Sequence, residues 1–448
     1  MTNSSFTLSS INLDQKQIQN LREETLNRFN AFKSKSLSLD MTRGKPGPDQ
    51  LALSNSLDGI LSGNFISPSK TDARNYGGLD GLSELKSLFA PVLEVKPEDM
   101  LIGGNSSLTL MYQYMDHAYH HGTRGKASAW INIEGGPSFL CPVPGYDRHF
   151  AICEFLGIRM INVPLNEDGI DLKTIEDLLK RDKTICGIWC VPKYSNPSGI
   201  TYSKENINEL VSLVKLARPE FRVMWDNAYA IHDLEENGKS LPPVLSLSEQ
   251  QGTSDKFVLF GSTSKISFAG AGVAFSAMNN ENLKSFQHYL SFQTIGPDKV
   301  NQLRHLHFFK TFDGLISHMK GHRELLKPKF DTVLNGLDAG LNNILPNHES
   351  SNIKDNSLSE SIFAKWTKPK GGYFISLDTL PGVASETIRL ASELGVKITP
   401  AGSTYPYGKD PEDKNIRLAP SFPSIDDLKI ATEAFTTALI LATVNKLS

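Results

Sequence analysis

The chain has 448 residues and a formal net charge of −3, so we expect two domains rather than one simple core, and no field strong enough to gather nucleic acid. Its four cysteines, Cys141, Cys153, Cys186 and Cys190, lie in apolar stretches without a CxxC pair, which favours buried reduced thiols over metal ligands, and no metal site is expected. The opening MTNSSFTLSS lacks the pattern of a signal peptide, and the longest apolar stretch, TTALILATV, is too short to span a membrane, so a cytoplasmic protein without membrane contact is expected.

The first predicted element is an amphipathic helix near the N-terminus. The apolar residues that fall on one of its faces at helical spacing are Ile18, Leu21, Phe29 and Phe32. Thr25 is the only polar residue on that stripe. The stretch LDMTRGKPGPDQLALS that follows is irregular and rich in glycine and proline. We assign residues 1–60 to an N-terminal arm and part of a small domain.

Strand-like and helical patterns then alternate from about residue 75 to residue 280. The apolar runs are DMLIGG, ASAWINI, ICGIWCVP, FRVMWDN, KFVLFGS and VAFSAMN, and the helix after the first carries Met111, Tyr112, Met115 and Tyr119. The alternation predicts an α/β fold with a mostly parallel sheet covered by helices on both faces. We assign it to a large domain of residues 61–315, and expect a ligand at the carboxyl ends of the strands.

A second, smaller α+β domain is predicted for residues 316–448. A long helical region is expected near residues 300–345. Beyond it, SIFAKWT, GGYFISL, GVKITPAG and KNIRLAP indicate a smaller sheet. Ser424 with Asp427 gives a capping-box start to a last helix over residues 425–446.

Two loops of the large domain carry polar residues with two interpretations each. GGNSSL, residues 103–108, lies between a strand and a helix, so its N–H groups and the helix dipole suit a phosphate. Ser106 in this loop fits a simple helix N-cap equally well. In VPKYSNPSG, Asn196 precedes a proline that holds it extended and able to aim its amide. A plain turn is at least as good an interpretation of that loop.

Two further segments carry ionisable groups at strand ends. In MWDNAYAIHD, Asp226 ends an apolar strand, where an unpaired carboxylate is costly, so it either meets a cation or caps the next helix. Tyr229 follows three residues later and is placed to point the same way. In GSTSKISFAGAGVAF, Lys265 follows Ser262 near the end of the strand DKFVLF, among hydroxyl and small or apolar residues. Such neighbours are unusual for a lysine on the protein surface.

Together the four segments fit one ligand with a phosphate, a phenolic oxygen, a protonated ring nitrogen and an aldehyde that requires an amine. Those are the parts of pyridoxal 5'-phosphate. The order of motifs resembles that of fold type I pyridoxal-phosphate enzymes, and specifically class I aminotransferases. The similar segments are RNYGGLDGLSELKSLF, PVPGYDRH, YSNPSG, WDNAY, STSK and, late in the chain, KPKGGYFISL, ELGVKITPAG and NIRLAPSF. MTRGKPGP, GGNSS and KISFAGAGVAF are most similar to a divergent bacterial aspartate aminotransferase subgroup.

The resemblance implies a role for each residue that meets the cofactor ring. Lys265 would hold the cofactor as a Schiff base and later carry the substrate proton. Asp226 would pair with the ring nitrogen and keep it protonated. Asn196 and Tyr229 would hold the phenolic oxygen, and Tyr146 would stack on the ring face.

The resemblance also implies residues for the phosphate and the substrate. The expected phosphate contacts are Asn105, Ser106, Ser262, Ser264 and, from the neighbouring subunit of a homodimer with shared active sites, Tyr76. Arg417 would bind the substrate α-carboxylate, and Gly44 and Asn196 would line the same place. One position departs from the family pattern, because Val273 stands where the family usually has a phosphate-binding arginine.

The implied reaction is the transfer of an amino group, from aspartate, to a 2-oxo acid, 2-oxoglutarate, by a ping-pong mechanism. Aspartate requires a second cation, and the candidates, each of which is equally a solvated surface charge, are Arg43, Lys45, Arg74 and Arg148. A carbon–sulfur lyase or a decarboxylase of the same fold would use the same lysine and aspartate. A non-catalytic regulatory domain of the aminotransferase type is disfavoured, because only about 40 residues precede TRGKPGP and they hold no basic recognition helix.

Overall fold

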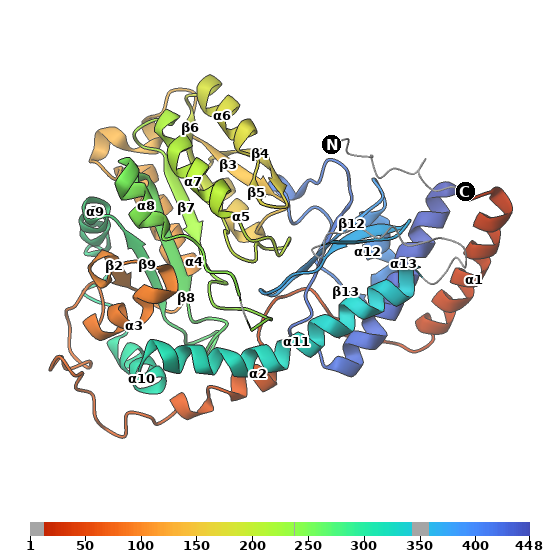
Figure 1. Cartoon of the computed structure of the whole chain (residues 1–448), viewed down its shortest axis with the longest axis horizontal. Helices are drawn as coiled ribbons and strands as arrows, with labels where there is room; N and C mark the ends of the chain where they lie inside the picture. Colours follow the sequence, from red (N-terminus) through yellow and green to blue (C-terminus); the bar gives the residue numbers. More distant parts are fainter. Residues whose placement is uncertain (1–12, 237, 343–357) are drawn as a thin grey trace.

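The computed structural model describes residues 13–236, 238–342 and 358–448, which form two lobes (Figure 1). The larger lobe holds an eight-stranded sheet. Its strands, in spatial order, are β2 Met100–Ile102, β9 Ala274–Met278, β8 Phe257–Ser262, β7 Arg222–Asp226, β6 Ile185–Cys190, β3 Ser138–Val143, β4 Arg159–Asn166 and β5 Gly169–Ile170. The strands from β8 to β4 run parallel, whereas β9 and β5 are antiparallel to their neighbours. The prediction of a mostly parallel sheet is confirmed.

Helices cover both faces of this sheet, as the continuous apolar strands require. On one face lie α3 Ser83–Leu93, α6 Leu172–Arg181, α7 Lys204–Leu213, α8 Val244–Gln251 and α10 Lys299–Phe309. On the other lie α4 Ser107–Asp116, α5 Asp147–Phe155 and α9 Asn280–Leu290. Successive side chains of β7 point to opposite faces of the sheet. Val223 and Trp225 pack in the core on the first face, and Met224 packs in the core on the second.

One predicted strand is wrong. The run ASAWINI forms two 3-10 turns, Lys126–Ser128 and Trp130–Asn132, and the strand of this region is β3, which follows it. Trp130 is buried, and its indole N–H donates to the carbonyl of Glu220 at 3.0 Å. The side-chain amide of Asn132 donates to the carbonyl of Lys126 at 2.9 Å, which closes the turn. A short apolar run has no periodicity that separates these two outcomes.

The smaller lobe holds a four-stranded antiparallel sheet and a helical layer. Its strands are β10 Leu358–Glu360, β11 Ala364–Thr367, β12 Ile375–Thr379 and β14 Asn415–Leu418. A separate parallel pair joins β1 Leu39–Asp40 to β13 Val396–Lys397. The helices are α1 Gln15–Lys33, α2 Pro48–Ala52, α11 Phe312–Asn342, α12 Ala384–Glu393 and α13 Ile425–Leu447. Helix α11 runs from the larger lobe into the smaller one (Figure 1).

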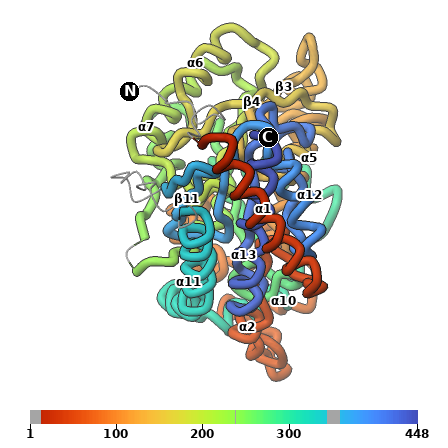
Figure 2. Tube along the Cα trace, turned by 90° about the vertical axis from the view of Figure 1, so that its right-hand side faces the viewer, coloured from red at the N-terminus to blue at the C-terminus, as the bar shows by residue number. Residues whose placement is uncertain are grey.

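The helices of the smaller lobe confirm two predicted features. In α1, Leu21, Thr25, Phe29 and Phe32 are buried, whereas Ile18 is partly exposed. This buried stripe packs on α13, which lies between α1, α11 and α12 (Figure 2). Ser424 caps α13 by accepting the N–H of Asp427 at 3.1 Å. The domain boundaries stay predictions, and the one after residue 315 falls in the first turn of α11.

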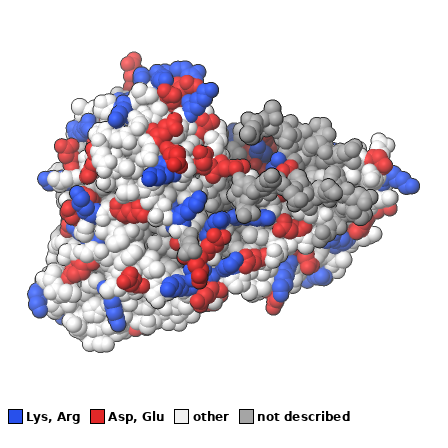
Figure 3. Space-filling view, in the orientation of Figure 1, with Lys and Arg blue, Asp and Glu red and all other residues white. Residues whose placement is uncertain are grey.

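The surface shows no segregation of charge on the face seen in Figure 3, where acidic and basic side chains are interspersed. No helix among the described residues is both long and apolar enough to cross a bilayer. All four cysteines are buried and free, and desolvation raises the pKa of the Cys141, Cys186 and Cys190 thiols. Within the described ranges, no three metal-ligating side chains come together.

Candidate active site

The predicted functional side chains meet where β6, β7 and β8 end, at the edge of the large sheet that faces the smaller lobe. Asp226 is the last residue of β7, Ser262 is the last residue of β8, and Asn196 follows β6. Arg417 reaches the same place from β14, and its Nη1 lies 3.3 Å from Oδ1 of Asn196. The site is therefore built from both lobes, as the carboxyl ends of parallel strands favour.

Lys265 follows β8 and is half-buried beside two aromatic rings. Its Nζ lies 4.9 Å from the ring centre of Tyr229 and 5.9 Å from that of Tyr373. Desolvation lowers the pKa of Lys265, and the Asp226 carboxylate opposes that shift in part. A lysine with a lowered pKa carries more of the neutral amine, which is the form that attacks carbonyl carbons and accepts protons.

Asp226 presents one carboxylate oxygen that is bound and one that is not. Its Oδ2 lies 3.0 Å from Nε2 of His149, and its Oδ1 is buried with no hydrogen-bond partner among the described residues. Asp226 is 3 % exposed, so the free oxygen is not satisfied by bulk water. The cap interpretation fails, because no helix follows that Asp226 caps. A hydrogen-bond donor from a ligand would satisfy this oxygen.

His149 is a site residue that the sequence analysis missed. It lies on α5, where its ring stacks on Trp189 with ring centres 4.1 Å apart and an interplanar angle of 6°. Tyr146 meets the same ring edge-on, at 4.9 Å. The available signal was its position one helical turn after Tyr146 in PVPGYDRH.

The two predicted tyrosines both stay protonated at neutral pH. Burial, with added repulsion from Asp226 and Asp147, raises the pKa of Tyr146 to about 12. Burial also raises the pKa of Tyr229 well above its usual value, with further contributions from Tyr146 and Asp226. Each phenol is therefore a hydrogen-bond donor, suited to an anionic oxygen nearby.

The predicted phosphate contacts come together at the junction of β8 with the first turn of α4. Ser262 Oγ donates to Ser264 Oγ at 3.1 Å, and Ser264 Oγ donates to the carbonyl of Asn105 at 3.3 Å. Ser106 is the N-cap residue of α4, but its side chain makes no capping hydrogen bond. The first N–H groups of α4 thus keep their capacity to bind an anion. Val273 is 1 % exposed and belongs to the core, so its side chain does not reach this place.

Arg417 is buried in contact with both polar and aromatic groups. Its Nη1 lies 3.1 Å from Oδ1 of Asp147, and its guanidinium lies 4.9 Å from the ring centre of Phe374. Its Nε is buried without a partner among the described residues. Gly44 packs against the tip of this aromatic ring, where an added Cβ would lie 2.4 Å from Phe374 Cζ. A side chain at position 44 would therefore displace the ring that supports Arg417.

The remaining predicted residues are exposed in the single chain. Tyr76 is 84 % exposed. Arg74 is exposed and binds Asp72 through both Nε and Nη2. The other three candidate cations for a substrate side chain, all exposed, are Arg43, Lys45 and Arg148.

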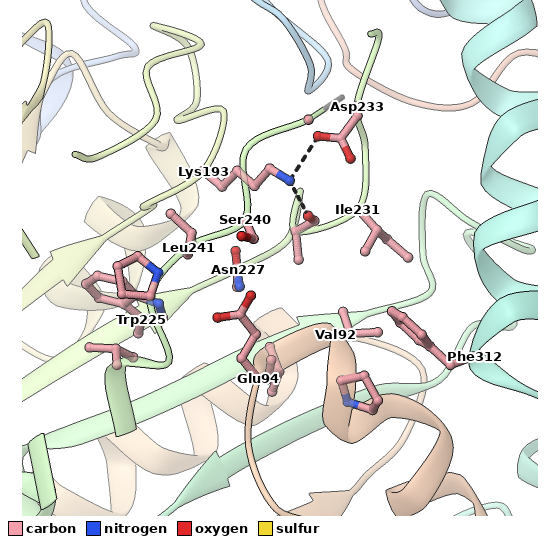
Figure 4. Close-up of a pocket in the computed structure, with 16 residues that line it drawn as sticks. Val92, Glu94, Lys193, Trp225, Asn227, Ile231, Asp233, Ser240, Leu241 and Phe312 are labelled. Carbon is pink, nitrogen blue, oxygen red and sulfur yellow. Dashed lines mark hydrogen bonds and ion pairs between the residues drawn. The ribbon is translucent and has the colours of Figure 1, made fainter. Parts of the chain in front are cut away.

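A buried ion pair supports the loop that carries Tyr229, and the sequence analysis did not identify it. Lys193 Nζ donates to the carbonyl of Ala230 at 2.8 Å and lies 2.9 Å from Oδ1 of Asp233 (Figure 4). The Tyr194 hydroxyl donates to the same oxygen of Asp233. Lys193 and Tyr194 thus anchor the loop at Ala230 and Asp233, and Lys193, Ala230 and Asp233 also line a pocket.

Comparisons with known proteins agree with this geometry. A family model described as aspartate amino-transferase matches residues 13–448. A putative aminotransferase of Mycolicibacterium smegmatis is 46 % identical over 93 % of this chain and 94 % of that protein. An aspartate aminotransferase of Corynebacterium glutamicum is 41 % identical over 97 % of both chains.

A solved structure extends the agreement to the fold. The crystal structure of an aspartate transaminase from Corynebacterium glutamicum has a TM-score of 0.91 and 40 % identity, and the match covers 99 % of this chain and 100 % of that one. The fold is therefore that of the fold type I aminotransferases, and the resemblance inferred from the motifs is confirmed. The chain belongs to the aspartate aminotransferase family.

Proposed function

We propose that this aminotransferase depends on pyridoxal 5'-phosphate and moves the amino group of aspartate to 2-oxoglutarate by a ping-pong mechanism. The observation that carries the cofactor is the buried and unpartnered Oδ1 of Asp226, which faces a site that also holds the half-buried amine of Lys265. A protonated ring nitrogen is the donor this oxygen requires. The choice of aspartate is supported by the names of relatives at 41 % and 40 % identity.

The residues of this chain fit the parts of that cofactor. Asp226 would hold the ring nitrogen, and Asn196 and Tyr229 the phenolic oxygen. Tyr146 would lie on the ring face, and Lys265 would reach the aldehyde carbon. The residues for the phosphate are Asn105, Ser106, Ser262 and Ser264, together with the first N–H groups of α4. These hydroxyl and N–H groups would bind the phosphate in place of the arginine that the family usually has at the position of Val273.

When bound, the cofactor supplies an aldehyde that captures amines and a ring that accepts electrons from the substrate Cα. Lys265 would contribute an amine that accepts the proton from Cα and delivers it to the carbon that was the cofactor aldehyde, and its lowered pKa favours that role. Asp226 keeps a negative charge beside the ring nitrogen, and His149 holds the carboxylate in place through Oδ2. Tyr229 donates its phenolic hydrogen, because its raised pKa keeps the phenol protonated.

Arg417 would bind the substrate α-carboxylate, because a planar guanidinium makes paired hydrogen bonds to a carboxylate. The Asp147 carboxylate lies 3.1 Å from Nη1, so the substrate carboxylate would compete with Asp147 for this nitrogen. Asn196 and the backbone at Gly44 complete the binding place. A second cation is required for the side chain of aspartate, and Arg43, Lys45 and Arg148 are exposed and available for it. Arg74 has Asp72 as a competing partner.

We further propose a cytoplasmic homodimer with shared active sites. Tyr76 is a large aromatic residue that is 84 % exposed in the single chain, and its loop is tied to α10 by Lys299, whose Nζ donates to the carbonyl of Gly77 at 2.5 Å. A fixed loop that presents an exposed tyrosine suits a contact with a second copy of the chain.

The test is a visible absorbance spectrum of the purified protein, followed by separate additions of aspartate, glutamate and alanine. We expect a coloured protein whose spectrum changes with aspartate, and recovery of the first spectrum after 2-oxoglutarate is added. Product analysis separates the alternatives, because a transaminase releases a 2-oxo acid, whereas a lyase or a decarboxylase releases ammonia or carbon dioxide. A colourless protein that binds no pyridoxal phosphate would refute the proposal.

A further inference from the structure

Beneath Lys265 lies a buried hydrogen-bond network that ends on the backbone of the lysine itself. The Tyr373 hydroxyl lies 3.3 Å from the carbonyl oxygen of Lys265. Nε2 of His322 lies 2.8 Å, and Nε2 of His318 2.7 Å, from the carbonyl oxygen of the next residue, Ile266. The two peptide groups that follow Lys265 are thus both held by side chains from outside their own loop.

Gln50, on α2, joins these groups from behind. Its Nε2 lies 2.9 Å from the hydroxyl oxygen of Tyr373 and 3.1 Å from Nδ1 of His322, and its Oε1 accepts the N–H of Gly47 at 3.2 Å. Gln50 is 0 % exposed, and His322 and Tyr373 are each 1 % exposed. Water therefore does not substitute for any of these bonds, and each has to be made within the protein.

Counting donors and acceptors fixes the direction of the bonds that start from Gln50. The N–H of Gly47 fixes the amide of Gln50 with its oxygen toward α2, so both hydrogens of Nε2 point to Tyr373 and His322. Tyr373 accepts one of them and must donate its own hydrogen onward, to Lys265. His322 accepts the other at Nδ1, so its proton is on Nε2 and is donated to Ile266.

The neutral state of the His322 ring is consistent with a hydrogen bond accepted at Nδ1 and one donated from Nε2. Burial, followed by the neighbouring His318, lowers the pKa of His322 to about 4, so its ring is neutral near pH 7 and Nδ1 is free to accept. Burial also lowers the pKa of His318. The donors and acceptors of these hydrogen bonds therefore stay the same across the neutral pH range.

The network also joins three distant parts of the chain at one point. Gln50 comes from α2, His318 and His322 come from α11, and Tyr373 precedes β12 in the smaller lobe. Helix α2 packs beside α11, and α11 runs along the base of both lobes (Figure 1). The same N-terminal segment holds Gly44, which packs on the Phe374 ring that supports Arg417.

From these contacts we infer that Gln50 and Tyr373 are positioning residues for Lys265. Through the Tyr373 hydroxyl they fix the peptide group of the lysine, and so the direction in which its amine leaves the backbone. The inference rests on the proposed role of Lys265. A misdirected amine would bind substrate normally but transfer the proton poorly, because proton transfer is far more sensitive to geometry than binding is.

Two variants break the same bond by different chemistry. Tyr373→Phe removes the hydroxyl that donates to Lys265. Gln50→Glu keeps the shape of the side chain but replaces the donor by an acceptor, so the Tyr373 hydrogen turns from Lys265 toward the new carboxylate, and Nδ1 of His322 loses its donor as well. The matched control is His117→Gln, because burial also lowers the pKa of His117 to about 4. His117 lies away from the network: its Nε2 contacts Ser285 on α9, which covers the second face of the large sheet.

The measurements are kcat and KM for the full-length holoenzyme, the visible circular dichroism of the bound cofactor, and the thermal unfolding midpoint. We expect each variant to lower kcat by roughly 10-fold, with KM changed by less than about threefold, and to change the circular dichroism band. The double variant is expected to be no worse than the more affected single variant, because both changes remove one bond. The control is expected to lower only the unfolding midpoint.

Wild-type kcat and circular dichroism in folded Tyr373→Phe and Gln50→Glu would overturn the inference. A loss of kcat that only tracks the fall in the unfolding midpoint, with His117→Gln losing kcat in the same proportion, would overturn it too. Failure of the proposed function is recognised separately, because the wild-type protein would then show no cofactor band, or Lys265→Ala would keep the wild-type spectrum.

Discussion

His149 and Asp226 meet across the site through one hydrogen bond of 3.0 Å, which satisfies Oδ2 of the carboxylate and leaves Oδ1 free. The histidine ring cannot rotate away, because it stacks on Trp189 at 4.1 Å. The carboxylate is thereby held in place, while Oδ1 has no hydrogen-bond partner among the described residues. This pair separates two tasks, in which one residue carries the charge and the other fixes its orientation.

The first prediction concerns the charge of Asp226. In Asp226→Asn the ring nitrogen loses its anionic partner, so we expect the rate of Cα proton loss to fall by about 100-fold or more, with substrate binding weakened far less. Single-turnover absorbance measurements with aspartate separate the two quantities. His149→Asn is the companion variant, and it is expected to lose less, because the carboxylate remains. An unchanged rate of proton loss in Asp226→Asn would show that its role is misassigned.

The second prediction concerns Lys265. We expect Lys265→Ala to retain non-covalent binding of pyridoxal phosphate and to lose turnover by about 10³-fold or more, because the attacking amine and the proton carrier are the same group. Lys256→Met is the matched control. Lys256 is also buried, burial lowers its pKa to about 8, and it lies beside the opposite end of β8. Normal turnover in a clean Lys265→Ala preparation, or equal losses in both variants, would contradict the assignment.

A third prediction tests the shared site through Tyr76. We expect Tyr76→Ala and Lys265→Ala to be impaired separately, and their coexpression to restore activity beyond the sum of the two. In a mixed dimer, a tyrosine that acts across the interface places both defects in one site and leaves the other intact. Differently tagged subunits isolate the mixed dimer for the assay. If every mixed dimer stays inactive, or the protein is a monomer by light scattering at assay concentration, Tyr76 does not serve a neighbour.

The fourth prediction is a loss of stability in mild acid. Burial lowers the pKa of both His117 and His322 from 6.5 to about 4. Between these values the unfolded chain binds more protons than the folded protein, so the free energy of unfolding falls as the pH is lowered through this window. Urea unfolding at the two ends of the window measures the loss. His117→Gln and His322→Gln should each reduce it by about 1 to 3 kcal/mol.

A wild-type protein that is equally stable at both ends of the window would show that the two buried histidines titrate normally.

Much of the fold and of the candidate site was predictable from the sequence, because the signals are local and ordered. Strands such as FRVMWDN are continuous apolar runs; Asp226 is the last residue of one such strand, and Lys265 lies three residues after the end of another. In a parallel sheet all these ends meet at one edge, so the order of the motifs alone brings Asn196, Asp226 and Lys265 together. The family follows from the same order, and the comparisons confirm it.

Only the tertiary structure decided which residues support the site. His149 and Asp226 are 77 residues apart, and Gln50 and His322 are 272 residues apart, so no local period connects them. Their meeting depends on how α5, α2 and α11 pack, which is set by the summed burial of two cores. The error at ASAWINI has the same origin, because the bond from Trp130 to Glu220 spans 90 residues. Local patterns determined where the reactive groups stand, and long-range packing decided what holds and orients them.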